Sequence, residues 1–140
     1  SGGTQLTDRS SIISALGSAA RIAIANPAHA PYGVAAQETL QSLGIYDSVI
    51  DRLIFAENVA DAVRIVEAGE ADYGIVALAL VLSQDHILID GDFHQPIRQT
   101  VALTKRGESN QAARAFFDVL VSPKGIAVLE KYGFVVEADS

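Results

Sequence analysis

The segment Asn26–Gly33 (Asn-Pro-Ala-His-Ala-Pro-Tyr-Gly) has the residue types and spacing of an anion-binding turn. The apolar run Arg21–Ala25 precedes it, and apolar residues at helical spacing follow from Val34. A strand that enters a helix through a proline-rich turn leaves the first N–H groups of that helix unpaired above the strand end. Such groups bind anions without a basic side chain, and glycine lets the backbone approach closely. The predicted ligand contacts in this turn are Pro31, Tyr32 and Gly33.

A second candidate contact region begins at Glu57, after the apolar run Leu53–Phe55. The carboxyl ends of parallel strands share one edge of an open α/β sheet, where ligands bind. Two helix starts at that edge, each carrying about half a positive charge, suit a tetrahedral dianion. We therefore predict contacts from Asn58 and Val59. The open alternative is that Glu57 or Asn58 only caps its own helix.

The sequence contains no recognisable catalytic or metal-binding motif. No serine lies in a Gly-x-Ser-x-Gly motif, and no glycine-rich phosphate loop ends in Lys-Ser or Lys-Thr. His29 has two possible roles, as a general base or as a hydrogen-bonded turn residue, and we favour the second. His86 and His94 suggest either a weak divalent site or an exposed loop, and we favour the loop. The acidic residues beside those two histidines are Asp85, Asp90 and Asp92. We predict no catalytic residue, metal ligand or cofactor.

Composition excludes several classes of protein. The 140 residues carry a net charge of −7 and no cluster of Lys or Arg, which disfavours nucleic-acid binding. No apolar run approaches the ~20 residues of a membrane-spanning helix. Cysteine is absent, which excludes disulfides and thiolate chemistry. Methionine is absent too, so we expect the chain to be a processed or excised piece of a longer product.

The first half of the chain alternates strand and helix patterns. The predicted strands are Arg21–Ala25, Leu53–Phe55 and Asp72–Leu78. The predicted helices are Ser10–Leu16, a helix from Val34 to Leu43, a short helical turn over Ile45–Ile50, and a helix from Glu57 to Gly69. This order is typical of an α/β domain with a mainly parallel open sheet and helices on both faces.

The second half adds two predicted strands and two predicted helices. The strands are Ile87–Ile89 and Ile97–Thr104, the latter alternating as an edge or antiparallel strand would. The first helix, Asn110–Val121, has five apolar residues expected to face the core: Ala112, Ala115, Phe116, Val119 and Leu120. The last helix opens at Ser122-Pro123 and runs to Lys131. We predict that residues 1–140 form a single α/β lobe.

Five segments, in this order and spacing, resemble the molybdate-binding periplasmic proteins of ATP-driven ABC importers. They are residues 21–36, 56–62, 67–78, 96–98 and 122–134. The resemblance implies one lobe of a type II periplasmic binding protein, which closes on a tetrahedral oxyanion held by neutral hydrogen-bond donors. It implies backbone N–H contacts from Tyr32 and Val59. A tyrosine hydroxyl found in some members corresponds here to Ala77, so Tyr32 is the alternative source of an aromatic wall or hydroxyl.

The resemblance also implies partners and a location. The chain corresponds to the second, ligand-gripping lobe, and most of an N-terminal lobe that completes the cleft is missing from it. The implied ligand is molybdate or tungstate, with sulfate as a further candidate, and the implied partner is the importer's membrane permease. The expected location is periplasmic or extracellular. The alternative is a stand-alone or regulator-linked oxyanion-sensing module that forms a homodimer through an exposed sheet edge.

Overall fold

A computed structural model describes residues 8–137. Contacts divide the chain into two compact units, Ser1–Ile97 and Arg98–Ser140, which we call unit 1 and unit 2 and describe separately. The single lobe predicted for residues 1–140 stays a prediction.

Unit 1 is built on a parallel sheet of three strands in the order β2-β1-β3. The strands are β1 (Ile22–Ala25), β2 (Leu53–Ala56) and β3 (Tyr73–Ile75). Every residue of the central strand β1 is buried, as expected for a strand covered on both faces. The predicted parallel open sheet is confirmed, and its three carboxyl ends lie at one edge.

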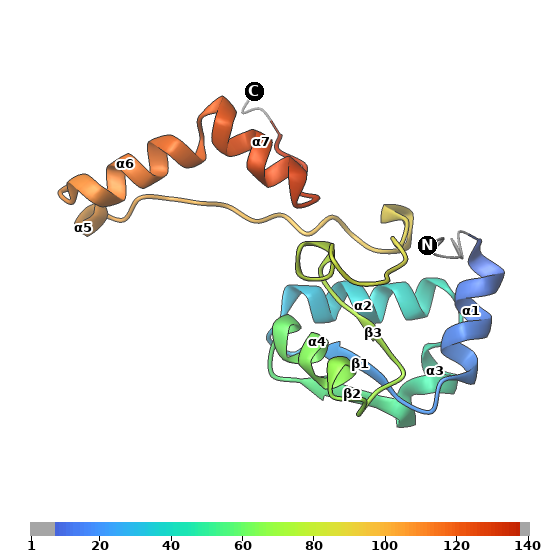
Figure 1. Ribbon diagram of the computed structural model, residues 1–140. Coiled ribbons are helices and arrows are strands. Elements are labelled where there is room, and N and C mark those ends of the chain that lie inside the picture. Colours follow the sequence, from blue (N-terminus) through green and yellow to red (C-terminus); the bar gives the residue numbers. More distant parts are fainter. Residues whose placement is uncertain (1–7, 138–140) are drawn as a thin grey trace. The chain divides into compact units, whose positions relative to one another are not determined.

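Helices cover both faces of this sheet (Figure 1). They are α1 (Arg9–Ser18), α2 (Pro31–Ser42), α3 (Tyr46–Val49) with the short 3-10 helix η1 (Ile50–Arg52), and α4 (Val59–Glu67). Ile22 and Ile24 pack into a core with α1, α2 and α3, whereas Ala23 packs into a second core with α4. Successive strand side chains point to opposite faces, so β1 contributes to both cores.

Two glycines end α2 and α4 where the sequence predicts it. Gly44 follows α2 with φ 74°, and Gly69 follows α4 with φ 75°. Both angles lie in the left-handed region that favours glycine. The helix α2 begins at Pro31, three residues before the expected start near Val34, because proline is well suited to the first helical position.

The predicted strands Ile87–Ile89 and Ile97–Thr104 are wrong, because neither segment has regular structure. Within residues 8–137, no strand pairs with either segment, and an extended backbone needs a neighbour to form a ladder. Between β3 and Lys105 the only regular elements are the 3-10 turns η2 (Leu78–Leu80) and η3 (Gly91–Phe93). The η3 region is attached to α2 instead, through a Ser42 Oγ bond to the Phe93 carbonyl at 2.8 Å.

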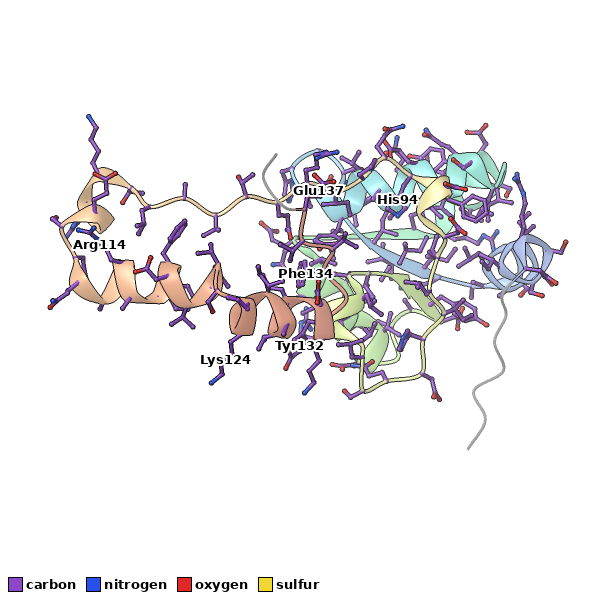
Figure 2. The ribbon with its side chains drawn as sticks, turned by 90° about the horizontal axis from the view of Figure 1, so that it is seen from above. His94, Arg114, Lys124, Tyr132, Phe134 and Glu137 are labelled. Carbon is purple, nitrogen blue, oxygen red and sulfur yellow. The ribbon has the colours of Figure 1, made fainter. Side chains whose placement is uncertain are left out.

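Unit 2 contains the two predicted helices, and a short additional helix precedes them. Its elements are α5 (Lys105–Glu108), α6 (Gln111–Leu120) and α7 (Pro123–Lys131). Asn110 caps α6, and Ser122 caps α7 by accepting the Gly125 N–H at 3.2 Å. Figure 2 shows Lys124 at the start of α7 and Tyr132 and Phe134 beyond its end. The Arg98 and Glu137 side chains pair at 2.7 Å between the two ends of the unit.

The predicted inward face of α6 is wrong in unit 2. Phe116 is 68% exposed and Val119 is 59% exposed. Ala112 and Ala115 are also exposed, and only Leu120 is half-buried. An amphipathic pattern identifies which face of a helix needs cover but not which element covers it.

Candidate oxyanion-binding site

Three turns leave the carboxyl edge of the sheet in unit 1. Ala25 and Ala56 are register partners at the ends of β1 and β2. The Asn26 N–H donates to the Ala56 carbonyl at 2.9 Å, which extends the pairing by one residue. The turn before α2 and the turn before α4 therefore start side by side.

The turn before α2 is closed by its own backbone. The Asn26 carbonyl accepts the His29 N–H at 3.2 Å and the Ala30 N–H at 2.9 Å. The Asn26 side chain also accepts the Ala28 N–H at 2.9 Å. These three bonds fix the path of the chain from the end of β1 to the start of α2.

The first turn of α2 has one unused donor. The Ala30 carbonyl accepts the N–H groups of Gly33 at 2.9 Å and Val34 at 3.1 Å. Pro31 has no N–H, and Ala30 provides no side-chain cap. Among residues 8–137, nothing accepts a hydrogen bond from the Tyr32 N–H. This is the donor that the resemblance implies for the anion.

Gly33 lies against the end of β1 more closely than any other residue type allows. A Cβ at Gly33 would lie 2.7 Å from the Ala25 carbonyl carbon, 2.8 Å from the Asn26 carbonyl carbon, and nearer still to the Ala25 oxygen. Real Cβ atoms do not come this close to backbone atoms. The absence of a side chain at Gly33 thus allows the first turn of α2 to lie against the end of β1.

The first turn of α4 has two unused donors. Asn58 Oδ1 accepts the Asp61 N–H at 2.9 Å, and the Asn58 carbonyl accepts the Ala62 N–H at 3.1 Å. In the described part of the chain, the N–H groups of Val59 and Ala60 have no acceptor. Asn58 therefore caps its own helix, as the open alternative stated, while the backbone donors beside it are unused.

The one carboxylate in the first turn of α4 is paired. Arg64 Nε donates to Asp61 Oδ1 at 2.9 Å. This side-chain hydrogen bond is the main reason that the pKa of Asp61 lies below its ordinary value of 3.8. The same bond raises the pKa of Arg64. The charge of Asp61 is thus balanced locally, and the helix start keeps its attraction for an anion.

The third turn supplies no side-chain donor at the predicted position. Ala77 is buried, two residues beyond the end of β3, and its carbonyl accepts the Leu80 N–H at 3.1 Å. Its methyl group cannot donate. Tyr32 is half-buried and is the second residue of α2. A contribution of the Tyr32 hydroxyl stays a prediction.

One contact at this edge has no counterpart in the sequence analysis. His29 Nε2 lies 2.9 Å from the Glu57 carbonyl oxygen, so the ring joins the turn before α2 to the turn before α4. A carbonyl only accepts, so Nε2 carries the hydrogen. His29 is therefore a hydrogen-bonded turn residue, as favoured. No local sequence pattern indicates its partner, because residues 29 and 57 meet only through the pairing of β1 with β2.

The other histidines bond to nearby backbone. His86 Nδ1 lies 2.9 Å from the Gln84 carbonyl, and His94 Nδ1 lies 2.8 Å from the Gln95 carbonyl. Residues 8–137 contain no group of three or more His, Asp or Glu side chains placed to hold a metal ion. Over the same residues, no helix has the length and apolar character needed to cross a bilayer.

Comparison with known proteins identifies the class. Residues 5–135 match the family described as bacterial extracellular solute-binding protein. The chain belongs to this family, whose members bind solutes and are not enzymes, so the prediction that the chain is not an enzyme is confirmed.

The relatives agree with the resemblance seen in the sequence. The chain is 34% identical over 119 residues to the molybdate-binding protein ModA of Rhodobacter capsulatus, covering 83% of this chain and 47% of that protein. It is 32% identical over 121 residues to ModA of Escherichia coli, covering 84% and 47%. The structure of the Azotobacter vinelandii periplasmic molybdate-binding protein matches with a TM-score of 0.78 and 30% identity, covering 86% of this chain and 56% of that one. The chain spans about half the length of the relatives it matches.

Proposed function

We propose that the chain binds a tetrahedral oxyanion, molybdate or tungstate, at the carboxyl edge of its sheet, with sulfate as a competing ligand. The observation that carries the proposal is the pair of helix starts on adjoining strands whose N–H groups have no acceptor within residues 8–137. These groups belong to Tyr32 on α2 and to Val59 and Ala60 on α4. Relatives named as molybdate-binding proteins support the choice of ligand.

The proposed binding mode uses neutral donors. The chain has a net charge of −7, and the one basic side chain recorded in the first two turns of α4, Arg64, is paired with Asp61. A dianion is then stabilised by helix dipoles and by hydrogen bonds to a charged acceptor, each worth about 1.5–3 kcal/mol. Pro31 and Gly33 hold the α2 donor in place, and Asn58 holds the α4 donors.

The greater length of the relatives suggests how tightly this chain binds the oxyanion and which partners the whole protein has. We propose that a preceding lobe supplies the remaining donors from the other side of the anion, so that this chain alone binds weakly. In the whole protein the loaded cleft delivers its oxyanion to the membrane permease of an ABC importer in the periplasm or outside the cell. Relatives described as periplasmic and extracellular solute-binding proteins support this location.

The test is an NMR titration of the ¹⁵N-labelled chain with sodium molybdate, tungstate, sulfate and phosphate, matched in ionic strength with sodium chloride. We expect saturable shifts of the Tyr32, Val59 and Ala60 amide resonances with molybdate and tungstate. NMR detects millimolar affinities, so weak binding by this chain alone is measurable. If none of the four anions moves these amides beyond the chloride control, the proposal is wrong.

A second candidate function, the sensing module that pairs as a homodimer, has one observation in its favour. β2 and β3 are the outer strands of the sheet, and within residues 8–137 neither has a partner on its outer side. Phe55 on β2 is 46% exposed and Tyr73 on β3 is 42% exposed. An exposed apolar edge pairs readily with a second copy. Sedimentation of the chain from 10 µM to 1 mM, roughly the range where weak dimers form, distinguishes the candidates, because only the module reading expects a dimer.

A further inference from the structure

We propose that His29 is a positioning residue that sets the spacing between the Tyr32 and Val59 donors and thereby the size of oxyanion the site prefers. This inference rests on the proposed function. It concerns the selectivity of the site, which the helix starts alone do not determine.

The His29 bond joins two points that lie close to the donors along the chain. His29 is three residues before Tyr32, and Glu57 is two residues before Val59. The bond between them, from Nε2–H to the Glu57 carbonyl, is 2.9 Å long. A change in this distance is therefore passed to the donors through very few rotatable backbone angles.

Both ends of the bond are held by rigid backbone. The His29 N–H donates to the Asn26 carbonyl, and prolines at 27 and 31 fix φ on either side of the turn. On the other side, Asn58 caps α4 directly after Glu57. The bond thus links two preformed pieces and does not order a flexible loop.

The two turns have only one other recorded link. The Asn26 N–H to Ala56 carbonyl bond holds them together at the strand ends, at 2.9 Å. In the part of the chain that the structure describes, no further hydrogen bond connects residues 26–33 with residues 56–60. Without the His29 bond the turns are hydrogen-bonded to each other only at their base, and the spacing of the helix starts above it depends on the packing of α2 and α4 against β1.

The spacing of the N–H donors is the property that can distinguish molybdate from sulfate. Molybdate and sulfate are tetrahedral dianions of equal charge, and molybdate is larger because its metal–oxygen bonds are longer. Dipoles and charge do not distinguish them, but the distance between fixed donors does, because hydrogen bonds weaken as their geometry departs from the optimum. Loss of the His29 bond should therefore reduce the preference of the site for molybdate over sulfate. It should change the stability of the fold less, since the His29 side chain is exposed.

The test compares H29A with H29Q in the 140-residue chain. Gln places an amide donor close to where His29 Nε2 lies, so H29Q keeps the bond and H29A removes it. Dissociation constants for molybdate and sulfate come from the amide titration, and thermal unfolding checks the fold. We expect H29A to weaken molybdate binding by about tenfold, the effect of one lost hydrogen bond, and to lower the molybdate-to-sulfate preference several-fold. We expect H29Q to stay within about twofold of the unchanged chain.

The outcomes separate this inference from the proposed function. If the unchanged chain binds no oxyanion, the proposed function fails and the inference fails with it. If the chain binds but H29A keeps its affinity and anion preference, only the role of His29 is wrong. A long-range ¹⁵N spectrum of the unchanged chain gives an independent check if H29A does not fold. It should show the Nε2–H tautomer of His29, and the Nδ1–H tautomer would overturn the inference.

Discussion

Gly33 shows how one missing side chain determines the geometry of the proposed site. A Cβ at this position would meet the backbone of Ala25 and Asn26 below 3.0 Å, where neither neighbour can rotate away. The start of α2 would have to lift from the end of β1. Stability and the placement of the Tyr32 donor are thus controlled by the same residue.

We expect G33A to destabilise unit 1 by about 1–3 kcal/mol or more, as overpacking against rigid groups does. The Tyr32 amide should also lose its shift with molybdate. Urea unfolding followed by circular dichroism measures the first effect, and the amide titration measures the second. The matched control is G17A, because a Cβ at Gly17 meets nothing within 4 Å in the helix α1 and should be neutral or stabilising by about 0.5–1 kcal/mol. Equal effects of the two substitutions would contradict the close-approach argument.

Substitutions of Asn58 can distinguish the capping of α4 from the binding of an anion. Its Oδ1 accepts the Asp61 N–H, and the unused Val59 and Ala60 N–H groups lie directly after it. Serine and aspartate are also good caps, but only aspartate brings a negative charge.

We therefore expect N58S and N58D to unfold within about 0.5 kcal/mol of the unchanged chain, whereas N58A loses about 1 kcal/mol. Oxyanion affinity should be kept in N58S and fall in N58D, because a carboxylate at the helix start repels the dianion. Thermal unfolding and the molybdate titration measure the two properties. A tight-binding N58D would show that the anion lies elsewhere.

At the scale of elements, the starts of α1 and α4 in unit 1 each carry a carboxylate whose pKa is lowered. Asp8 caps α1 by accepting the Ser11 N–H at 2.7 Å, and this bond is the main cause of its lowered pKa. Asp61 in α4 has a lowered pKa chiefly through its hydrogen bond from Arg64. Both carboxyl groups therefore bind protons less readily in the folded chain than in the unfolded chain.

Stability should accordingly fall in acid. The unfolded carboxyls have the ordinary value of 3.8 and the folded ones lie below it, so their contribution is complete above 3.8 and is lost as the pH falls through the folded values. Thermal unfolding from pH 6 to pH 2, about the range over which carboxyl groups titrate, measures this dependence. D61N should flatten the curve in this range, because it removes one of the two carboxyls whose pKa is lowered in the folded chain. A flat curve for the unchanged chain would contradict the expected coupling.

The elements that sequence reasoning predicted well are those with local signals. β1 is a continuous apolar run, α2 has proline at its start and glycine at its end, and α4 has an Asn cap. The unused N–H groups of Tyr32 and Val59 follow from those same local signals. The strands expected at 87–89 and 97–104 did not form, because a strand is defined by a partner that no local pattern names.

The bond between His29 and Glu57 was missed for a related reason. The two residues are 28 positions apart and meet only because β1 and β2 are neighbours in register. Alternation of strands and helices predicts parallel strands, but their lateral order arises from packing of the whole sheet. The contact becomes visible only once that order is known.

At the scale of the whole molecule, unit 2 exposes an apolar surface along its two long helices. Its members are Phe116, Val119, Val121, Val128 and Tyr132. These side chains are close to half exposed or more, so within residues 98–137 they contribute little to the folded state. Neighbouring phenylalanines on α6 allow a direct comparison, because Phe117 is half-buried.

We expect F116A to change the free energy of unfolding by less than about 0.5 kcal/mol, as exposed substitutions do. F117A should cost about 2 kcal/mol, part of the 3–5 kcal/mol of a fully buried phenylalanine. Loss of α6 helicity on heating, followed by circular dichroism and by amide resonances of α6, measures both. A large cost for F116A in this chain would mean that the exposed face is covered in solution.

The neutrality of the donors at the sheet edge has a consequence for the speed of binding. A chain of net charge −7 repels an approaching dianion at long range, and the N–H groups attract it only within the last few ångströms. Added salt screens the repulsion over about 10 Å at 0.1 M but leaves the short-range hydrogen bonds nearly unchanged. Capture should therefore become faster as ionic strength rises, whereas a site built from lysine and arginine would become slower.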